Sequence, residues 1–199
     1  SLTTSLEIAR DIFVESPLPH PSVMLRKEEL QSLGRYQDHG WAEDYDLWLR
    51  YFIAGKQIGK IPKVLLYWRD HPSRTSRTDS RYSVENFLKA KVYYLLRGPL
   101  LNRDTIIIWG AGQMGKRISK HLIRSEAPVN SFLDINPRKI GQTLRGRPIY
   151  SANHLPTLWQ QSARPVVLVS VGSHSARSLI RNKMQNWGFN ETEDYWCVA

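Results

Sequence analysis

The stretch Thr105–Gly115 (TIIIWGAGQMG) decides the fold of the second half of the chain. Consecutive apolar residues run into a glycine turn, and the turn opens a basic amphipathic helix predicted over 114–125. Gly110 permits the tight turn, Gly112 lets a phosphate approach the backbone, and Gly115 lets the helix pack close to the strand. The start of the helix then offers N–H groups and the positive end of a dipole to an anion.

Strand and helix patterns alternate after this turn, and the strands are almost continuously apolar. This pattern predicts an α/β fold, with residues 104–199 forming a small Rossmann-like domain around a parallel sheet covered on both faces. The expected elements are strands over 105–109, 129–134, 165–171 and 194–198, helices over 114–125, near 154–160 and over 174–187, and a loop over 135–150.

Asp134 ends the second of these strands, 19 residues after Gly115. An acid at this place can bind a ribose hydroxyl, which makes Asp134 a candidate nucleotide ligand. It can equally begin the turn at Asn136-Pro137, and the sequence favours neither role. The first turns of the predicted helix carry Lys116, Arg117 and Lys120. These cations form a solvated helix face or attract phosphate or anionic lipid, and both roles stay open.

The first half is expected to form a separate domain over 1–97, with the boundary at 98–104. Its periodicity predicts helices over 2–14, 27–33, 46–54 and 84–97, strands over 22–25 and 61–68, and a polar loop over 70–82.

Composition narrows the class of protein. The 199 residues carry a net charge of +10, of which +7 falls on residues 102–199, so anionic ligands are favoured. No basic run resembles a nucleic-acid arm, and we expect no nucleic-acid partner. The single cysteine, Cys197, suits a reducing cytoplasm, and no apolar run reaches the roughly 20 residues of a membrane span.

Three segments of the first half could carry chemistry. Residues 41–50 (WAEDYDLWLR) place two acids, Glu43 and Asp44, at the start of a helix, where acids also simply cap N–H groups. Residues 67–73 (YWRDHPS) carry His71 after a predicted strand, where a histidine can bind metal or lie on the surface. Residues 16–26 form a proline-rich loop that lines a site or turns a corner.

Together, in this order, these segments resemble the C-terminal part of the catalytic domain of family 2 glycosyltransferases, which have a GT-A fold. The resemblance is carried by PLPHPSVMLRKEEL, LGRY and WAEDYDLWLRYFIAGKQIGKIPKVLLYWRDHPSRTS. It implies that Asp44 is the catalytic base with Glu43 beside it. It also implies that His71 helps to hold the metal–diphosphate. Acceptor-side positions fall on His20, Ser22 and Trp41.

Inverting sugar transfer needs a carboxylate that takes the proton of the acceptor hydroxyl, and a divalent cation opposite the leaving diphosphate. The resemblance therefore implies Mg²⁺ or Mn²⁺ in the full-length enzyme, a nucleotide-sugar donor and a glycan or lipid-linked acceptor. The expected role is cell-envelope polysaccharide or glycolipid synthesis in the cytoplasm, including the inner membrane face and contact with anionic lipid. The family's first half, with its metal-binding D-x-D motif, is absent, so this chain is expected to be a C-terminal portion that is inactive alone.

Residues 104–199 resemble the small Rossmann-like domain that precedes the left-handed helix in sugar acyltransferases, through IIIWGAGQMGK, FLDINPRKIGQTLRGRPIY and VVLVSVGS. That resemblance implies binding of a nucleotide or nucleotide-sugar at Gly110, Gly112, Gly115 and Asp134. Three alternatives stay open: a non-catalytic binding module, an NAD-dependent sugar-modifying oxidoreductase, and a scaffold that has lost its ligand and packs against the transferase or forms a homodimer.

Overall fold

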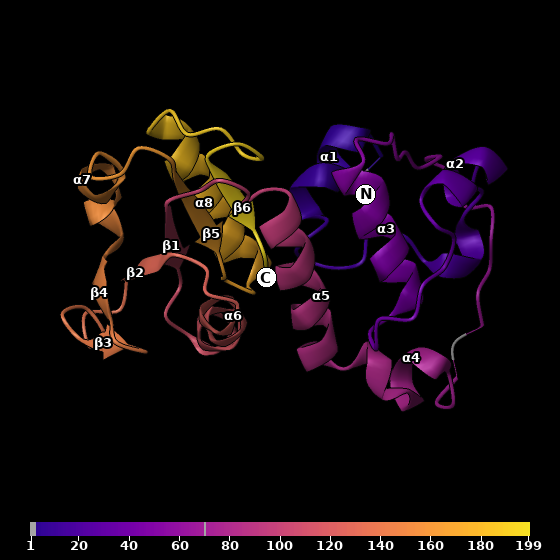
Figure 1. Cartoon of the computed structure of the whole chain (residues 1–199), viewed down its shortest axis with the longest axis horizontal. Coiled ribbons are helices and arrows are strands. Elements are labelled where there is room, and N and C mark those ends of the chain that lie inside the picture. Colours follow the sequence, from indigo (N-terminus) through magenta and orange to yellow (C-terminus); the bar gives the residue numbers. More distant parts are fainter. Residues whose placement is uncertain (1–2, 70) are drawn as a thin grey trace. The chain divides into compact units, whose positions relative to one another are not determined.

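The computed structural model describes residues 3–69 and 71–199. Leu2, near the start of the first predicted helix, and Asp70, in the predicted polar loop, lie outside the described residues. The chain divides into two compact units, Ser1–Tyr94 and Leu95–Ala199 (Figure 1). The dividing point falls within helix α5 (Val84–Arg97).

The described part of the first unit is helical. Its elements are α1 (Ser5–Asp11), η1 (His20–Ser22), α2 (Lys27–Ser32), α3 (Glu43–Ile53), α4 (Thr75–Thr78), η2 (Ser80–Tyr82) and most of α5. The core lies around α3, whose Tyr45 is fully buried. The Tyr45 hydroxyl donates to the carbonyl oxygen of Ile12 at 2.7 Å, and its ring packs against Phe87 of α5 with centroids 5.1 Å apart.

Two strands predicted in this unit are not formed. The segment predicted as a strand over 22–25 begins in the 3-10 turn η1, where Ser22 Oγ donates to the carbonyl oxygen of Pro19 at 2.7 Å, and continues without regular structure. Residues 61–68 are also irregular, and they expose Ile61, Val64, Leu65 and Tyr67. No strand exists in the described part of this unit to pair with either segment. The loop predicted over 70–82 contains the short helices α4 and η2.

The second unit confirms the α/β class. Its elements are β1 (Thr105–Trp109), α6 (Gln113–Arg124), β2 (Val129–Asp134), β3 (Thr143–Leu144), β4 (Arg147–Ser151), η3 (Ala152–His154), α7 (Leu155–Trp159), β5 (Pro165–Val169), α8 (His174–Asn186) and β6 (Tyr195–Cys197). The strands form one sheet in the order β3-β4-β2-β1-β5-β6, and only the β3–β4 pair is antiparallel.

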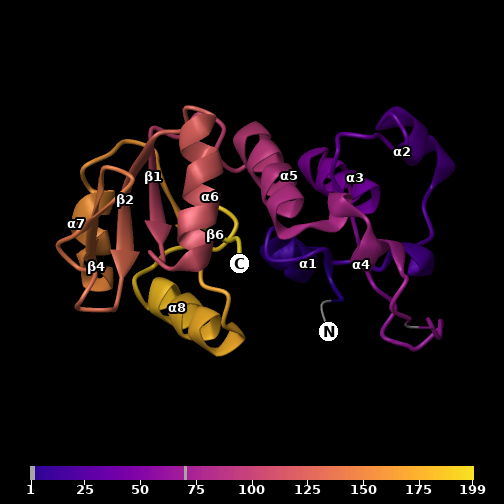
Figure 2. The same ribbon diagram turned by 90° about the horizontal axis from the view of Figure 1, so that it is seen from below.

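The order of the strands places the helices on two faces. The chain moves from β1 outward to β2 and β4, and then returns through β5 to β6. Because such crossovers are right-handed, α6 covers one face while α7 and α8 cover the other, as Figure 1 shows. The direction reverses between β1 and β5, where ligands of open α/β sheets characteristically bind. Figure 2 shows α6 lying along β1.

The loop predicted over 135–150 contains β3 and β4, which the sequence analysis missed. Arg145 and Gly146 both have positive φ and form the two-residue turn between these strands. Arg147 joins β4 to β2 through a side-chain hydrogen bond, because its Nε donates to the carbonyl oxygen of Val129 at 2.7 Å. A short hairpin rich in Gly and Pro carries no apolar run, so its pattern resembles that of a loop.

Candidate functional site

The glycine turn after β1 is tightly packed at two of its three glycines. Gly110 has φ +113°, and a Cβ there would lie 3.0 Å from Ser170 Oγ and 3.2 Å from the Ser170 carbonyl oxygen. A Cβ at Gly115 would lie 1.8 Å from the carbonyl oxygen of Gly110, a distance that no side chain can accommodate. Gly115 therefore lets α6 begin directly against the end of β1.

Gly112 differs from the other two glycines. It stands at the N-cap of α6 with φ −87° and ψ −161°, and no atom lies within 4 Å of a Cβ built on it. The cap position has no side-chain hydrogen bond. Because the first N–H groups of a helix have no partner within the helix, this open side is where an anion would approach the backbone.

Asp134 lies across from this turn at the end of β2, and both of its oxygens are occupied. Oδ2 accepts from Ala111 N–H at 3.0 Å and from Lys139 Nζ at 2.9 Å, while Oδ1 accepts from Asn136 N–H at 2.9 Å. Burial alone would raise the pKa of Asp134, but the hydrogen bonds from Asn136, Lys139 and Ala111 outweigh it and lower the pKa. Asp134 thus organises the turn that follows β2, and its role as a ribose ligand stays a prediction.

Two basic side chains from loops lie near the first turn of α6. Arg145, in the turn after β3, donates from Nε and Nη2 to the carbonyl oxygen of Lys116 at 3.3 and 3.0 Å. Lys139 is partly exposed beside Asp134. A phosphorylated ligand at Gly112 would therefore meet cations from two loops as well as the helix dipole.

In the first unit, the structure brings three of the predicted site residues together. Glu43 and Asp44 begin α3, and His20 Nδ1 lies 4.0 Å from Glu43 Oε1. Nε2 of the same ring lies 2.8 Å from the hydroxyl of Tyr36. A carboxylate, an imidazole and a phenol thus stand in a row, although His20 and Glu43 are 23 residues apart in the chain.

Asp44 lies in an environment that favours its protonated form. Burial raises the pKa of Asp44, and the neighbouring Glu43 carboxylate raises it further, against the lowering effect of the Tyr45 N–H. Asp44 Oδ1 accepts that N–H at 2.7 Å. A carboxylate with a raised pKa is suited to taking up a proton, which is the task of a general base.

Sequence reasoning missed two further groups at Glu43. The hydroxyl of Tyr82 donates to Glu43 Oε1 at 3.2 Å, and Arg81 Nη1 lies 3.8 Å from Oε2. Burial raises the pKa of Tyr82, and Asp44 and Glu43 raise it further. Both groups belong to η2, about 40 residues after the acids, and no local spacing in the sequence could have identified them.

The remaining predicted residues are engaged elsewhere. Trp41 donates its indole N–H to Asp46 Oδ1 at 2.8 Å, and Ser22 is held by Pro19. His71 is exposed, with Nδ1 3.0 Å from Ser73 Oγ. Within the described residues, none of the three forms a hydrogen bond or ion pair with Glu43 or Asp44.

No group of three or more His, Cys, Asp or Glu side chains that could hold a metal ion is found in residues 3–69 and 71–199. The same part of the chain contains no helix long and apolar enough to cross a membrane.

Comparison with known proteins finds similarity to one domain family and to one curated glycosyltransferase. The CoA binding domain family matches residues 102–186, which is less than half of the chain and lies within the second unit. The chain is also 40% identical over 53 residues to the amylovoran biosynthesis glycosyltransferase AmsE of Erwinia amylovora. That match covers 27% of this chain and 20% of the glycosyltransferase, so the chain spans only a fifth of the length of this relative.

The solved structures that match part of the chain have low sequence identity and low TM-scores. UDP-D-quinovosamine 4-dehydrogenase from Vibrio fischeri is 22% identical, with 44% of this chain and 74% of that chain covered and a TM-score of 0.38. RSP, a Rex-family repressor, is 14% identical, with 56% of this chain and 60% of the repressor chain covered and a TM-score of 0.42.

Proposed function

We propose that this chain is the C-terminal portion of an inverting, nucleotide-sugar-dependent glycosyltransferase of the GT-A type, followed by a nucleotide-binding unit. The observation that carries the proposal is Asp44, a carboxylate with a raised pKa beside Glu43 and His20. The 40% identity to a segment of a biosynthetic glycosyltransferase supports it. The proposed product is a cell-envelope polysaccharide or glycolipid.

In the proposed reaction, Asp44 accepts the proton of an acceptor hydroxyl as that oxygen attacks the anomeric carbon of the donor. The bond from the anomeric carbon to the nucleoside diphosphate breaks in the same step, and the leaving group keeps the electron pair. Tyr82 donates a hydrogen bond to Glu43, Arg81 Nη1 lies 3.8 Å from it, and the Glu43 carboxylate raises the pKa of Asp44, which favours the uptake of a proton by Asp44. A divalent cation, when bound, would stabilise the charge that develops on the leaving diphosphate.

The test uses the protein that contains the whole catalytic domain. Asp44→Asn should lower the rate of sugar transfer about 100-fold or more, because general-base catalysis contributes about that much. The Kd of the donor should stay unchanged. Glu28→Gln, which changes an exposed acid on α2, is the matched control and should transfer sugar normally. Normal turnover in Asp44→Asn would refute the assignment of the base.

A second proposed function belongs to the second unit alone, and Gly112 favours it. The open, uncapped start of α6 and the cations near it suit a phosphorylated nucleotide. The family match adds CoA to the nucleotide, nucleotide-sugar and NAD expected from the sequence. Thermal shifts of the 199-residue chain with UDP, UDP-sugars, NAD⁺ and CoA separate these ligands. A shift with NAD⁺ alone favours an oxidoreductase, and no shift with any of them favours a scaffold.

Gly112→Val provides the variant for that experiment. A Cβ at this position would meet no atom within 4 Å, so the unit should stay folded. Any ligand-induced rise in Tm should disappear. A normal shift in this variant would show that the glycine turn is not the ligand site. Contact with anionic lipid and homodimer formation are further proposals that vesicle flotation and light scattering would test.

A further inference from the structure

A cavity lies in the Rossmann-like unit, at the end of the sheet opposite the glycine turn. It has a volume of about 430 Å³ and is lined by the end of α7, the segment after α8 and the residue before β6. These segments lead into the amino ends of β5 and β6, whereas Gly112 follows the carboxyl end of β1. The cavity is therefore separate from the proposed nucleotide site, and its size is that of a small-molecule pocket.

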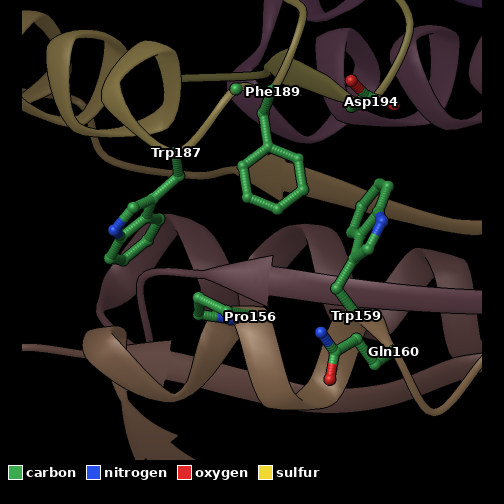
Figure 3. Close-up of a pocket in the computed structure, with 7 residues that line it drawn as sticks. Pro156, Trp159, Gln160, Trp187, Phe189 and Asp194 are labelled. Carbon is green, nitrogen blue, oxygen red and sulfur yellow. The ribbon is translucent and has the colours of Figure 1, made fainter.

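Aromatic rings form its walls, as Figure 3 shows. Trp159 and Phe189 pack edge to face, with centroids 4.7 Å apart and planes at 71°, and Trp187 lies on the other side of Phe189. Pro156 forms the floor between the two tryptophans. All four side chains are partly exposed, so their apolar faces remain accessible from the cavity.

Polar groups without protein partners stand beside these rings. Asp194 Oδ2 accepts from Asn190 N–H at 2.8 Å, but Oδ1 has no hydrogen-bond partner among the described residues. The side-chain amide of Gln160 is exposed and also bonds to nothing in the described part of the chain. The cavity thus combines apolar faces with an acceptor and an amide at its edge.

Charge limits the class of ligand. The lining contains the Asp194 carboxylate and no Lys, Arg or His, so the lining itself offers a phosphate or other anion no cationic partner. A cation is also disfavoured, because Lys183 Nζ already lies 4.9 Å from the centroid of the Trp187 ring and residues 102–199 carry a charge of +7. The angle of 71° between Trp159 and Phe189 does not provide two parallel faces for a flat base. A neutral ring with one apolar face and several hydroxyl groups satisfies all of these conditions.

We propose that this cavity, formed by Trp159, Trp187, Phe189, Gln160 and Asp194, binds a neutral saccharide ring. The C–H face of the sugar packs on an aromatic ring, while its hydroxyls donate to Asp194 Oδ1 and exchange hydrogen bonds with Gln160. This proposal stands on the cavity alone and does not depend on the glycosyltransferase assignment or on the nucleotide site.

The experiment is a titration of the ¹⁵N-labelled 199-residue chain, followed by the indole N–H signals of its tryptophans. The probes are glucose, galactose and N-acetylglucosamine with the disaccharides maltose, cellobiose and lactose, and AMP and choline serve as competitors of other classes. We expect saturable shifts of the Trp159 and Trp187 signals with at least one sugar, with a Kd of about 1–10 mM. No saturable shift with any sugar up to about 50 mM, or shifts with AMP or choline alone, would overturn the proposal.

Variants locate the binding. Gln160→Ala changes an exposed side chain and should weaken sugar binding about tenfold without altering Tm, and Asp194→Asn, which can still accept from Asn190, should weaken it similarly. Trp159→Ala should abolish it. Glu28→Gln, which changes an exposed acid on α2, is the control and should bind sugar normally. Unchanged affinity in all three cavity variants would contradict the proposal, and nucleotide binding in the same samples shows whether the other site still functions.

Discussion

The hydroxyl of Tyr94 donates a hydrogen bond to Oδ1 of Asp46 at 2.7 Å, deep inside the first unit. The same carboxylate accepts the indole N–H of Trp41 at 2.8 Å and Nε of Arg50 at 2.8 Å, and it is fully buried. Asp44 and Asp46 form a D-x-D sequence, yet only Asp44 lies with Glu43 and His20 in the candidate site. Asp46 instead joins α3 to the segment before it and to α5.

Asp46→Ala should strongly destabilise the first unit. The change leaves Arg50 without its carboxylate and leaves the Trp41 and Tyr94 donors unpaired, which costs about 3–5 kcal/mol by analogy with broken buried ion pairs. Asp46→Asn keeps one acceptor and should cost less. Urea unfolding followed by tryptophan fluorescence measures both, with Glu28→Gln as a surface control. A midpoint in Asp46→Ala equal to that of the control would contradict this role.

Asp44→Asn should stabilise the fold at neutral pH. Because the folded state raises the pKa of Asp44, it binds the proton more tightly than the unfolded chain does. Asp44 therefore costs stability as pH rises from its unfolded pKa of about 3.9 through the higher folded value. The Tm of Asp44→Asn should exceed that of the native chain at pH 7, and the difference should shrink below about pH 4. A lower Tm at pH 7 would indicate that the carboxylate is stabilising.

Asp134→Asn should have the opposite pH dependence. The pKa of Asp134 is lowered in the folded state, so its carboxylate contributes stability above the unfolded pKa of about 3.9, and that contribution is lost as pH falls through the lower folded value. The variant should lose about 1–3 kcal/mol at pH 7 and less at about pH 2. Denaturant unfolding at several pH values checks this, and a pH-independent difference would contradict it.

Gly115→Ala and Gly112→Ala should differ sharply in stability. A methyl group at 115 meets the Gly110 carbonyl oxygen, so α6 must move away from β1, at a cost of about 1–3 kcal/mol or more. A methyl group at 112 meets nothing within 4 Å and should leave the Tm within about a degree of the native value. Differential scanning fluorimetry of the pair makes the comparison. Equal Tm values would show that the close approach at Gly115 is not required.

Residues 61–68 should become protected in the protein that contains the whole catalytic domain. In this chain they expose large apolar side chains, among them Tyr67 at 93% and Val64 at 74%, and apolar surface of this kind favours contact with another surface. Hydrogen–deuterium exchange should be fast at 61–68 in the 199-residue chain and markedly slower in the longer protein. Helix α5 is an internal reference. Equal exchange in the two proteins would indicate that the segment stays uncovered.

The sequence predicts those elements whose signal is local. The strands at 105–109 and 129–134 and the helix at 84–97 are confirmed at the predicted bounds. The failures depend on distant partners. Residues 61–68 have the apolar run of a strand, but the described part of the first unit offers nothing to pair with it. The hairpin of β3 and β4 forms because β2 lies beside β4.

The same distinction applies to the candidate sites. Glu43 and Asp44 are recognisable because they are adjacent, and the glycines because their spacing is fixed. Tyr36, Tyr82 and Arg81 reach His20 and Glu43 only through the fold, so no sequence pattern marks them. The cavity beside Trp159 was missed for the same reason, since its lining comes from three separate segments.

The three glycines of the turn should respond differently to natural selection. Gly110 and Gly115 are required by backbone packing, so a descendant that no longer binds any nucleotide must still keep them in order to fold. Gly112 is not required by backbone packing, so other residues can replace it once the ligand is lost. In a survey of related sequences, the residue at position 112 would therefore distinguish domains that bind a nucleotide from domains that have lost it. The presence of Gly110 and Gly115 would indicate only that the domain can fold.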